Sequence, residues 1–156
     1  MQVREIMTKD VSSCSPGTNA AAAGEKMWNK GCGSLPVIER NGRVIGIVTD
    51  RDLFIALATQ NRRASDLLVG EVMRRELSVC KPGDDVRQAL KIMAKHRVHR
   101  LPAVEETGAL QDIPSMDDVI LHTDAAFNDD AVWALEAIVG HRQPEPCDVR
   151  GHSRDE

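Results

Sequence analysis

Aromatic side chains are scarce in this sequence: its 156 residues include two Trp, two Phe and no Tyr. The hydrophobic core must therefore be aliphatic, built from Val, Ile, Leu, Met and Ala. Long apolar runs are also missing, since none approaches the roughly 20 residues that cross a membrane, and the start of the chain has no signal-peptide core. These absences argue against a membrane protein and predict a cytoplasmic location.

Strong charge of one sign and metal-ligand spacing are missing too. The net charge is −4 with both signs mixed, and no long basic run occurs, so nucleic acid is not a favoured partner. We interpret the short basic pair Arg74-Arg75 as solvated surface. The four cysteines form no C-x-x-C pair and no His cluster has zinc spacing, so no metal site is predicted and the cysteines are expected to be free thiols.

The chain is an internal duplication. Shifted by 66 residues, it matches itself without a gap, as in Cys14 with Cys80, Pro16-Gly17 with Pro82-Gly83, Leu35-Pro36 with Leu101-Pro102, and Asp52 with Asp118. We divide it into a first repeat (1–60), a linker (61–68), a second repeat (69–122) and a C-terminal helix with a polar tail (123–156). Because one such unit makes a marginal core, we expect the two to pack sheet to sheet around one shared apolar layer.

Each repeat predicts the same order of elements: strand, helix, hairpin, helix. The strands 11–17 and 77–83 end in a Pro-Gly turn, and Thr18 or Asp84 can cap the helix that follows. Asn41-Gly42 is a hairpin signal. The second helix of each repeat opens at a T-x-x-D or S-x-x-D motif.

A further amphipathic helix is predicted after the repeats. Asn128 is its expected cap, Val132, Leu135 and Val139 are expected on its buried face, and Gly140 is its expected stop. The polar residues 142–156 are expected to be frayed. Five further positions are interpreted as buried or packing residues: Cys14, Cys80, Met27, Trp28 and Trp133.

The motif Thr49-x-x-Asp52 by itself is a variant of the capping box. Two facts favour a binding role: the motif recurs at Ser115-x-x-Asp118, and it follows a strand, where a helix start can hold an anion. A carboxylate there with no cation partner nearby can accept two ribose hydroxyls, and the neighbouring hydroxyl can reach a phosphate. The motif thus raises the hypothesis of a bound nucleotide.

The stretch GSLPVIERNGRVIGIVTDRD, residues 33–52, closely resembles the CBS domain, and two tandem copies resemble a CBS pair, or Bateman module. The resemblance covers roughly residues 1–122. It implies an α+β fold of two tandem CBS-type β-α-β-β-α repeats packed sheet to sheet with pseudo-twofold symmetry. It also implies two clefts for an adenosine-containing ligand (AMP, ADP, ATP, or else S-adenosylmethionine or NAD) that regulates a partner protein.

The resemblance implies the cleft residues as well. Asp52 and Asp118 would hold ribose hydroxyls, and Thr49 and Ser115 would face the phosphate. The remaining candidates line the base and phosphate regions or supply positive charge: Gly33, Ser34, Leu35, Pro36, Arg51, His99, Arg100, Leu101 and Pro102.

The second repeat departs from the family pattern at two positions. Pro114 removes a donor from its strand, and Asp112 would repel a phosphate if it pointed into the cleft. The first cleft is therefore expected to bind more tightly than the second.

Two function classes stay open, and neither is an enzyme. The chain has no Ser/His/Asp set, no P-loop and no G-x-G-x-x-G motif. The first hypothesis is an adenine-nucleotide sensor that changes its own shape or dimer packing. The alternative is a ligand-free scaffold for dimerisation or protein–protein contact; a hydrolase using the cleft acids is a third, weaker idea. The resemblance suggests a homodimer, a flat disc of four repeats with helices at the contact, to which the extra helix adds unless it covers a cleft.

Overall fold

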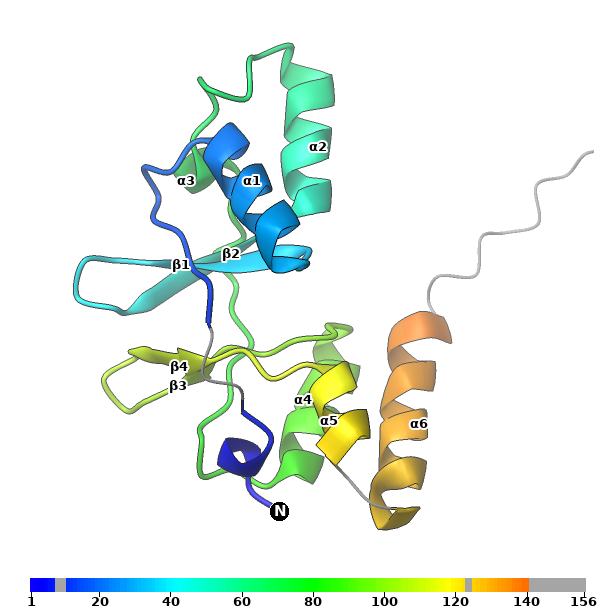
Figure 1. The fold of residues 1–156 in the computed structure, drawn as a ribbon. Helices are drawn as coiled ribbons and strands as arrows, with labels where there is room; N and C mark the ends of the chain where they lie inside the picture. Colours follow the sequence, from blue (N-terminus) through cyan, green and yellow to red (C-terminus); the bar gives the residue numbers. More distant parts are fainter. Residues whose placement is uncertain (8–10, 123–124, 141–156) are drawn as a thin grey trace, which may run out of the picture.

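The computed structural model describes residues 1–7, 11–122 and 125–140, so the predicted polar tail lies outside the described residues. Two similar units lie one above the other, and each follows the predicted order of helix, hairpin and helix (Figure 1). The elements are η1 (Val3–Glu5), α1 (Ala20–Lys30), β1 (Ser34–Ile38), β2 (Val44–Thr49), α2 (Asp50–Gln60), α3 (Val69–Val72), α4 (Val86–His96), β3 (Ala103–Val104), β4 (Leu110–Asp112), α5 (Met116–His122) and α6 (Ala125–Val139).

Each repeat folds around one antiparallel hairpin. β1 pairs with β2, and β3 pairs with the shorter β4. The second hairpin is shorter because Pro114, at the position of Val48, has no N–H to donate, although its carbonyl still accepts from the amide of Leu101 at 3.1 Å. The predicted strands 11–17 and 77–83 form no regular strand; each adds a single parallel bridge, as Cys14 does to Val37.

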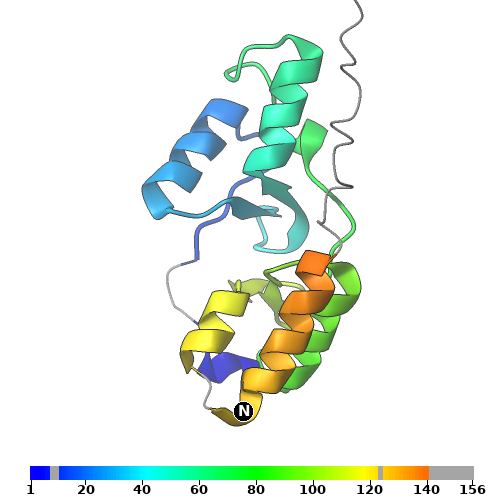
Figure 2. The same cartoon turned by 90° about the vertical axis from the view of Figure 1, so that its right-hand side faces the viewer.

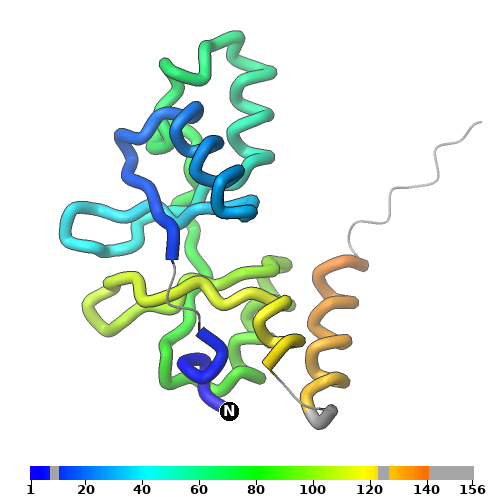
Figure 3. The backbone as a smooth tube through the Cα atoms, in the orientation of Figure 1, coloured from blue at the N-terminus to red at the C-terminus, as the bar shows by residue number. Residues whose placement is uncertain are grey.

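The two hairpins face each other at the centre of the molecule, with helices on the outer sides (Figures 1 and 3). Their turns are joined by two backbone hydrogen bonds of 3.1 Å, from Val44 to Gly108 and from Leu110 to Gly42. The arrangement is the predicted α+β fold, with the two repeats related by a pseudo-twofold axis.

The repeats exchange their first segments. η1 packs into the core of the second repeat, whereas α3, although it opens the second repeat in sequence, packs into the core of the first. The buried apolar side chains form two separate clusters, so the expectation of one shared apolar layer is wrong. Each sheet packs its apolar face against its own helices, and the exchanged segments tie the two cores together.

The observed caps of α1 and α4 each lie one residue beyond the predicted cap. Asn19 and Asp85 cap α1 and α4, accepting from the amides of Ala22 and Arg87 at 2.9 and 2.8 Å. The hydroxyl of Thr18 instead accepts from a turn amide at 3.1 Å, that of Ser15.

α6 packs against α4 and α5 of the second repeat (Figure 2). It begins at Ala125, so Asn128 lies inside the helix and is not its cap. Its buried face is made by Ala131, Ala134 and Ile138, whereas Val132 and Val139 are half exposed, so the predicted face is wrong at these two valines. Leu135, the third residue of that face, is partly buried and packs against the core of the second repeat. Small alanines let α6 approach α4 closely, which a face of larger residues would prevent.

Among the described residues, none covers the helices of the first repeat in this way. Trp28 on α1 is 86% exposed, which contradicts its predicted packing role, and Phe54 on α2 is 71% exposed. Within the described parts of the chain, no helix has the length and apolar character needed to cross a membrane.

Candidate functional site

Thr49 ends β2 and caps α2, so the motif at residues 49–52 is the predicted capping box. The amide of Asp52 donates to Thr49 Oγ1 at 3.1 Å. In return, Asp52 Oδ2 accepts from the amide and the hydroxyl of Thr49 at 3.3 and 2.8 Å. One oxygen of the carboxylate is therefore used to build the helix start, and the other is left to bind something else.

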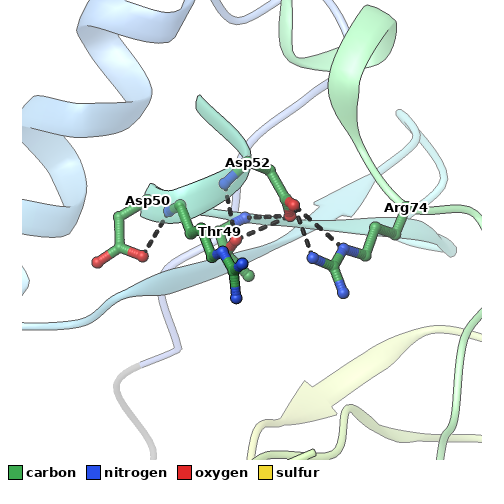
Figure 4. Close-up of polar contacts among 5 residues, drawn as sticks. Thr49, Asp50, Asp52 and Arg74 are labelled. Carbon is green, nitrogen blue, oxygen red and sulfur yellow. Dashed lines mark hydrogen bonds and ion pairs between the residues drawn. The ribbon is translucent and has the colours of Figure 1, made fainter. Parts of the chain in front are cut away.

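That other oxygen is engaged by a cation. Arg74 donates to Asp52 Oδ1 through Nη2 at 2.7 Å and through Nε at 3.2 Å, and Figure 4 shows the two side chains turned toward each other. The assumption that Asp52 has no cation partner is therefore wrong, as is the interpretation of Arg74 as plain solvated surface. Burial raises the pKa of Asp52, but the hydrogen bonds from Arg74 and Thr49 outweigh it and hold that pKa below its ordinary value.

The exchange of segments explains why Arg74 reaches this site. Arg74 follows α3, and its backbone pairs with Ile47 of β2 through hydrogen bonds of 2.8 and 3.0 Å. Gly46 leaves room for this approach, since a Cβ there would lie 2.8 Å from Met73 Sδ and 2.9 Å from the Arg74 carbonyl oxygen. Gly46 is thus a sequence signal that a second segment lies against β2.

The second repeat reproduces the capping geometry. Asp118 Oδ2 accepts from the amide and hydroxyl of Ser115 at 2.7 and 2.6 Å, and Ser115 Oγ accepts from the amide of Asp118 at 3.2 Å. Among the described residues, none donates a hydrogen bond to Asp118 Oδ1. The repeat equivalent of Arg74 is Thr8, which lies outside the described residues.

The predicted lining segments lie directly beside the two motifs. In the first repeat Ser34 is opposite Thr49, and the carbonyl of Gly33 accepts from the amide of Asp50 at 3.0 Å. In the second repeat Arg100 is opposite Ser115. Five lining side chains are buried, of which Leu35 and Leu101 belong to the core clusters: Ser34, Leu35, Pro36, Leu101 and Pro102.

The expected basic residues differ in exposure. Arg51 is exposed in the first turn of α2, whereas His99 and Arg100 are half buried. Asp112, the expected source of repulsion, is only 3% exposed. Burial raises the pKa of the Cys80 thiol to about 12, and the charges of Asp84 and Asp112 add to this effect. Asp112 is thus buried in the second hairpin, where it pairs with Ala103, and is not exposed to solvent.

Two surface cavities lie on the first repeat. One of about 600 Å³ is lined by residues 15–17 and 38–41. The other, of about 560 Å³, lies between α1 and α2 and includes Trp28 and Phe54. Neither is lined by Thr49 or Asp52, although the second includes Gly33 and Asp50, so the argument for the candidate site rests on hydrogen-bonding geometry.

Comparison with known families and proteins agrees with this architecture. The model of the CBS domain matches the chain twice, at residues 3–59 and 69–122. The CBS domain-containing protein YhcV of Bacillus subtilis is 32% identical over 120 residues, which cover 77% of this chain and 84% of YhcV. The uncharacterized protein MK0525 of Methanopyrus kandleri is 29% identical over 120 residues, but the match covers only 61% of that protein, against 77% of this chain.

Solved structures show the same fold. The CBS domain pair of protein MJ0100, in complex with 5′-methylthioadenosine and S-adenosylmethionine, superposes with a TM-score of 0.69 at 21% identity, covering 78% of this chain and 98% of that one. CBSX2 in complex with AMP gives a TM-score of 0.67 at 24% identity, covering 77% and 93%. With two family matches that span most of its length, this chain belongs to the CBS domain family as a tandem pair.

Proposed function

We propose that the protein is a sensor of adenosine-containing ligands that regulates a partner protein and is not an enzyme. The observation that carries the proposal is the matched helix start in both repeats, where a hydroxyl and a carboxylate stand at the end of a strand in the same geometry. The family membership and the ligands named for CBSX2 and MJ0100 support an adenosyl ligand. AMP, ADP and ATP are the preferred candidates, with S-adenosylmethionine and NAD as others.

In this proposal the ribose binds the carboxylate oxygen that does not cap the helix, which is Oδ1 of Asp52 or Asp118. Asp118 is the simpler case, because its Oδ1 receives no hydrogen bond from the described residues and can take a sugar hydroxyl directly. Ser115 is held beside it at 2.6 Å and can turn toward a phosphate. This reverses the predicted ranking of the clefts: within the described residues, no internal partner of Asp118 Oδ1 has to be displaced in the second cleft, whereas in the first the ligand must displace Arg74.

The ligand experiment is isothermal titration with AMP, ATP and S-adenosylmethionine. Asp118→Ala is expected to remove most of the heat with the preferred ligand, because it deletes the ribose acceptor. Asp117→Ala is the matched control, since Asp117 is the neighbouring acid in the same turn and is exposed. Saturable binding that survives Asp118→Ala and Asp52→Ala together would contradict the proposed site.

The alternative is a CBS scaffold without ligand, and one observation favours it: the ion pair that fills Asp52. A scaffold would show no heat with any adenosyl ligand, in the native chain or in Arg74→Ala. The same titration therefore separates the two functions.

We further propose that the protein forms a homodimer through the helices of the first repeat. In the second repeat α6 covers the α4/α5 face, so a flat disc that uses both helical faces is blocked while α6 is docked. The equivalent α1/α2 face is open, holds the cavity of about 560 Å³ and exposes Trp28 and Phe54. Because α6 covers the α4/α5 face of the second repeat, we expect the equivalent α1/α2 face of the first repeat to be covered too. In the proposed dimer, the helices of a second copy cover it.

Light scattering coupled to size-exclusion chromatography tests the dimer. Trp28→Glu is expected to give a monomer, because it places a charge in the contact. Trp133→Glu on α6 is the control, since Trp133 is 53% exposed on the outer side of α6 and is expected to leave the dimer intact. A native monomer, or dissociation by Trp133→Glu alone, would refute this arrangement.

The three described cysteines, Cys14, Cys32 and Cys80, are free thiols. Free thiols are the ordinary state in a reducing compartment. We therefore retain the cytoplasm as the proposed location.

A further inference from the structure

Arg74 is the cation that holds the candidate site of the first repeat. It holds Asp52 through two hydrogen bonds to the same carboxylate oxygen, at 2.7 and 3.2 Å. We infer that Arg74 makes the first cleft selective for adenosyl ligands that carry a negatively charged group beside the ribose, such as a 5′-phosphate. This inference rests on the proposed function, because it concerns the ligand class of the same site.

The carboxylate of Asp52 has no spare acceptor position. An ionised carboxylate offers about four lone-pair positions on its two oxygens. Thr49 takes two of them on Oδ2, and Arg74 takes two on Oδ1. A ribose hydroxyl can reach Asp52 only by displacing the guanidinium of Arg74, so every ligand of this cleft competes with an internal cation.

The displaced guanidinium stays close to the bound ligand. The backbone of Arg74 is fixed to β2 by its two hydrogen bonds with Ile47, so only the side chain can move. The side chain is 60% exposed, and among the described residues it is held by the carboxylate of Asp52. A phosphate beside the ribose offers it a new anionic partner with the same two-pronged geometry. An uncharged nucleoside offers none, and a cationic sulfonium group adds repulsion.

The second cleft lacks this feature by sequence. The residue 66 positions before Arg74 is Thr8, which is uncharged. The first cleft is therefore expected to select its ligands by displacement of this arginine. The substitution Arg74→Thr makes the first cleft resemble the second and is the natural test.

The test compares AMP with adenosine, which differ only in the phosphate, by isothermal titration in the Asp118→Ala background. We expect AMP to bind the first cleft at least tenfold more tightly than adenosine, about the contribution of one charge-assisted pair. Arg74→Thr is expected to abolish most of this ratio, by weakening AMP and by slightly strengthening adenosine, which no longer competes with the arginine. Arg75→Thr, the neighbouring exposed arginine, is the matched control and should leave the ratio unchanged.

Two failures are distinguishable. If AMP and adenosine both bind but Arg74→Thr leaves their affinity ratio unchanged, the charge filter is refuted while the sensor proposal stands. If neither ligand binds the native chain or any variant, the proposed function itself fails and the inference falls with it. Thermal unfolding of each variant confirms that the ratio is measured on folded protein.

Discussion

The docking of α6 on the second repeat gives a stability prediction that needs no ligand. Ile138 lies on the inner face of α6 and is 2% exposed, within the core cluster of the second repeat. Ile138→Ala deletes three carbon atoms from that contact. At about 0.8 kcal/mol per buried carbon the transfer cost is roughly 2.4 kcal/mol, and the residual cavity places the total at about 2–5 kcal/mol.

Val139 provides an internal control one residue away. It is 49% exposed on the same helix, so Val139→Ala should change the free energy of unfolding by less than about 0.5 kcal/mol. Urea denaturation followed by circular dichroism measures both variants, and the slope of each transition checks that the same surface unfolds. Equal losses for the two variants would mean that α6 does not pack on α4, and the argument for an asymmetric dimer face would lose its basis.

Three other perturbations test the local geometry. Gly46→Ala should lower the free energy of unfolding by about 1–3 kcal/mol because its Cβ would meet the backbone of Arg74. Gly17→Ala is the control and should be tolerated, since no atom lies within 4 Å of a Cβ at that position. Equal urea midpoints for the two variants would contradict the close approach at Gly46. The pKa of Asp52 is lowered in the folded state, so its ion pair stabilises the fold above the ordinary pKa of 3.8, and this contribution is lost as pH falls through the folded value. The difference in the free energy of unfolding between the native protein and Arg74→Thr, under about 1 kcal/mol at neutral pH, should therefore close in acid. A difference that widens in acid would refute the pairing. Burial raises the pKa of Cys14 to about 11 and that of Cys80 to about 12. A thiol reagent at pH 8 should therefore modify the more exposed Cys32 before it modifies Cys14 or Cys80. Early labelling of Cys80 in single-cysteine variants would overturn this prediction.

The duplicated fold and the helix starts at Thr49 and Ser115 could be predicted from sequence because both are local. A capping box needs four consecutive residues, and a repeat needs only a shift in register. The starts of α1 and α4 were misplaced by one residue because each is preceded by two adjacent side chains that can cap a helix, Thr18-Asn19 and Asp84-Asp85. Local pattern cannot choose between them, since the choice depends on which side chain also closes the preceding turn.

The partner of Asp52 could not be predicted, because it depends on which repeat a connecting segment packs against. Arg74 is 22 residues from Asp52, and the sequence assigns it to the second repeat, residues 69–122. It joins the first site only because α3 is exchanged between the cores. The prediction that Val132 and Val139 are buried on α6 was wrong for a similar reason. Hydrophobicity favours the valines, but the helix packs against the second repeat through its alanines.

The helix α2 connects the proposed ligand site to the proposed dimer contact. Asp52 lies in its first turn, held by Arg74, and Phe54 lies two residues later on the exposed α1/α2 face. A ligand that displaces Arg74 changes the forces on the start of this helix, and in the proposed dimer the same helix contacts the second copy. The second repeat lacks this connection, because α6 already covers its helices and no described cation holds Asp118. A signal that acts through dimer packing should therefore originate in the first cleft, whereas occupation of the second cleft should leave the dimer contact unchanged.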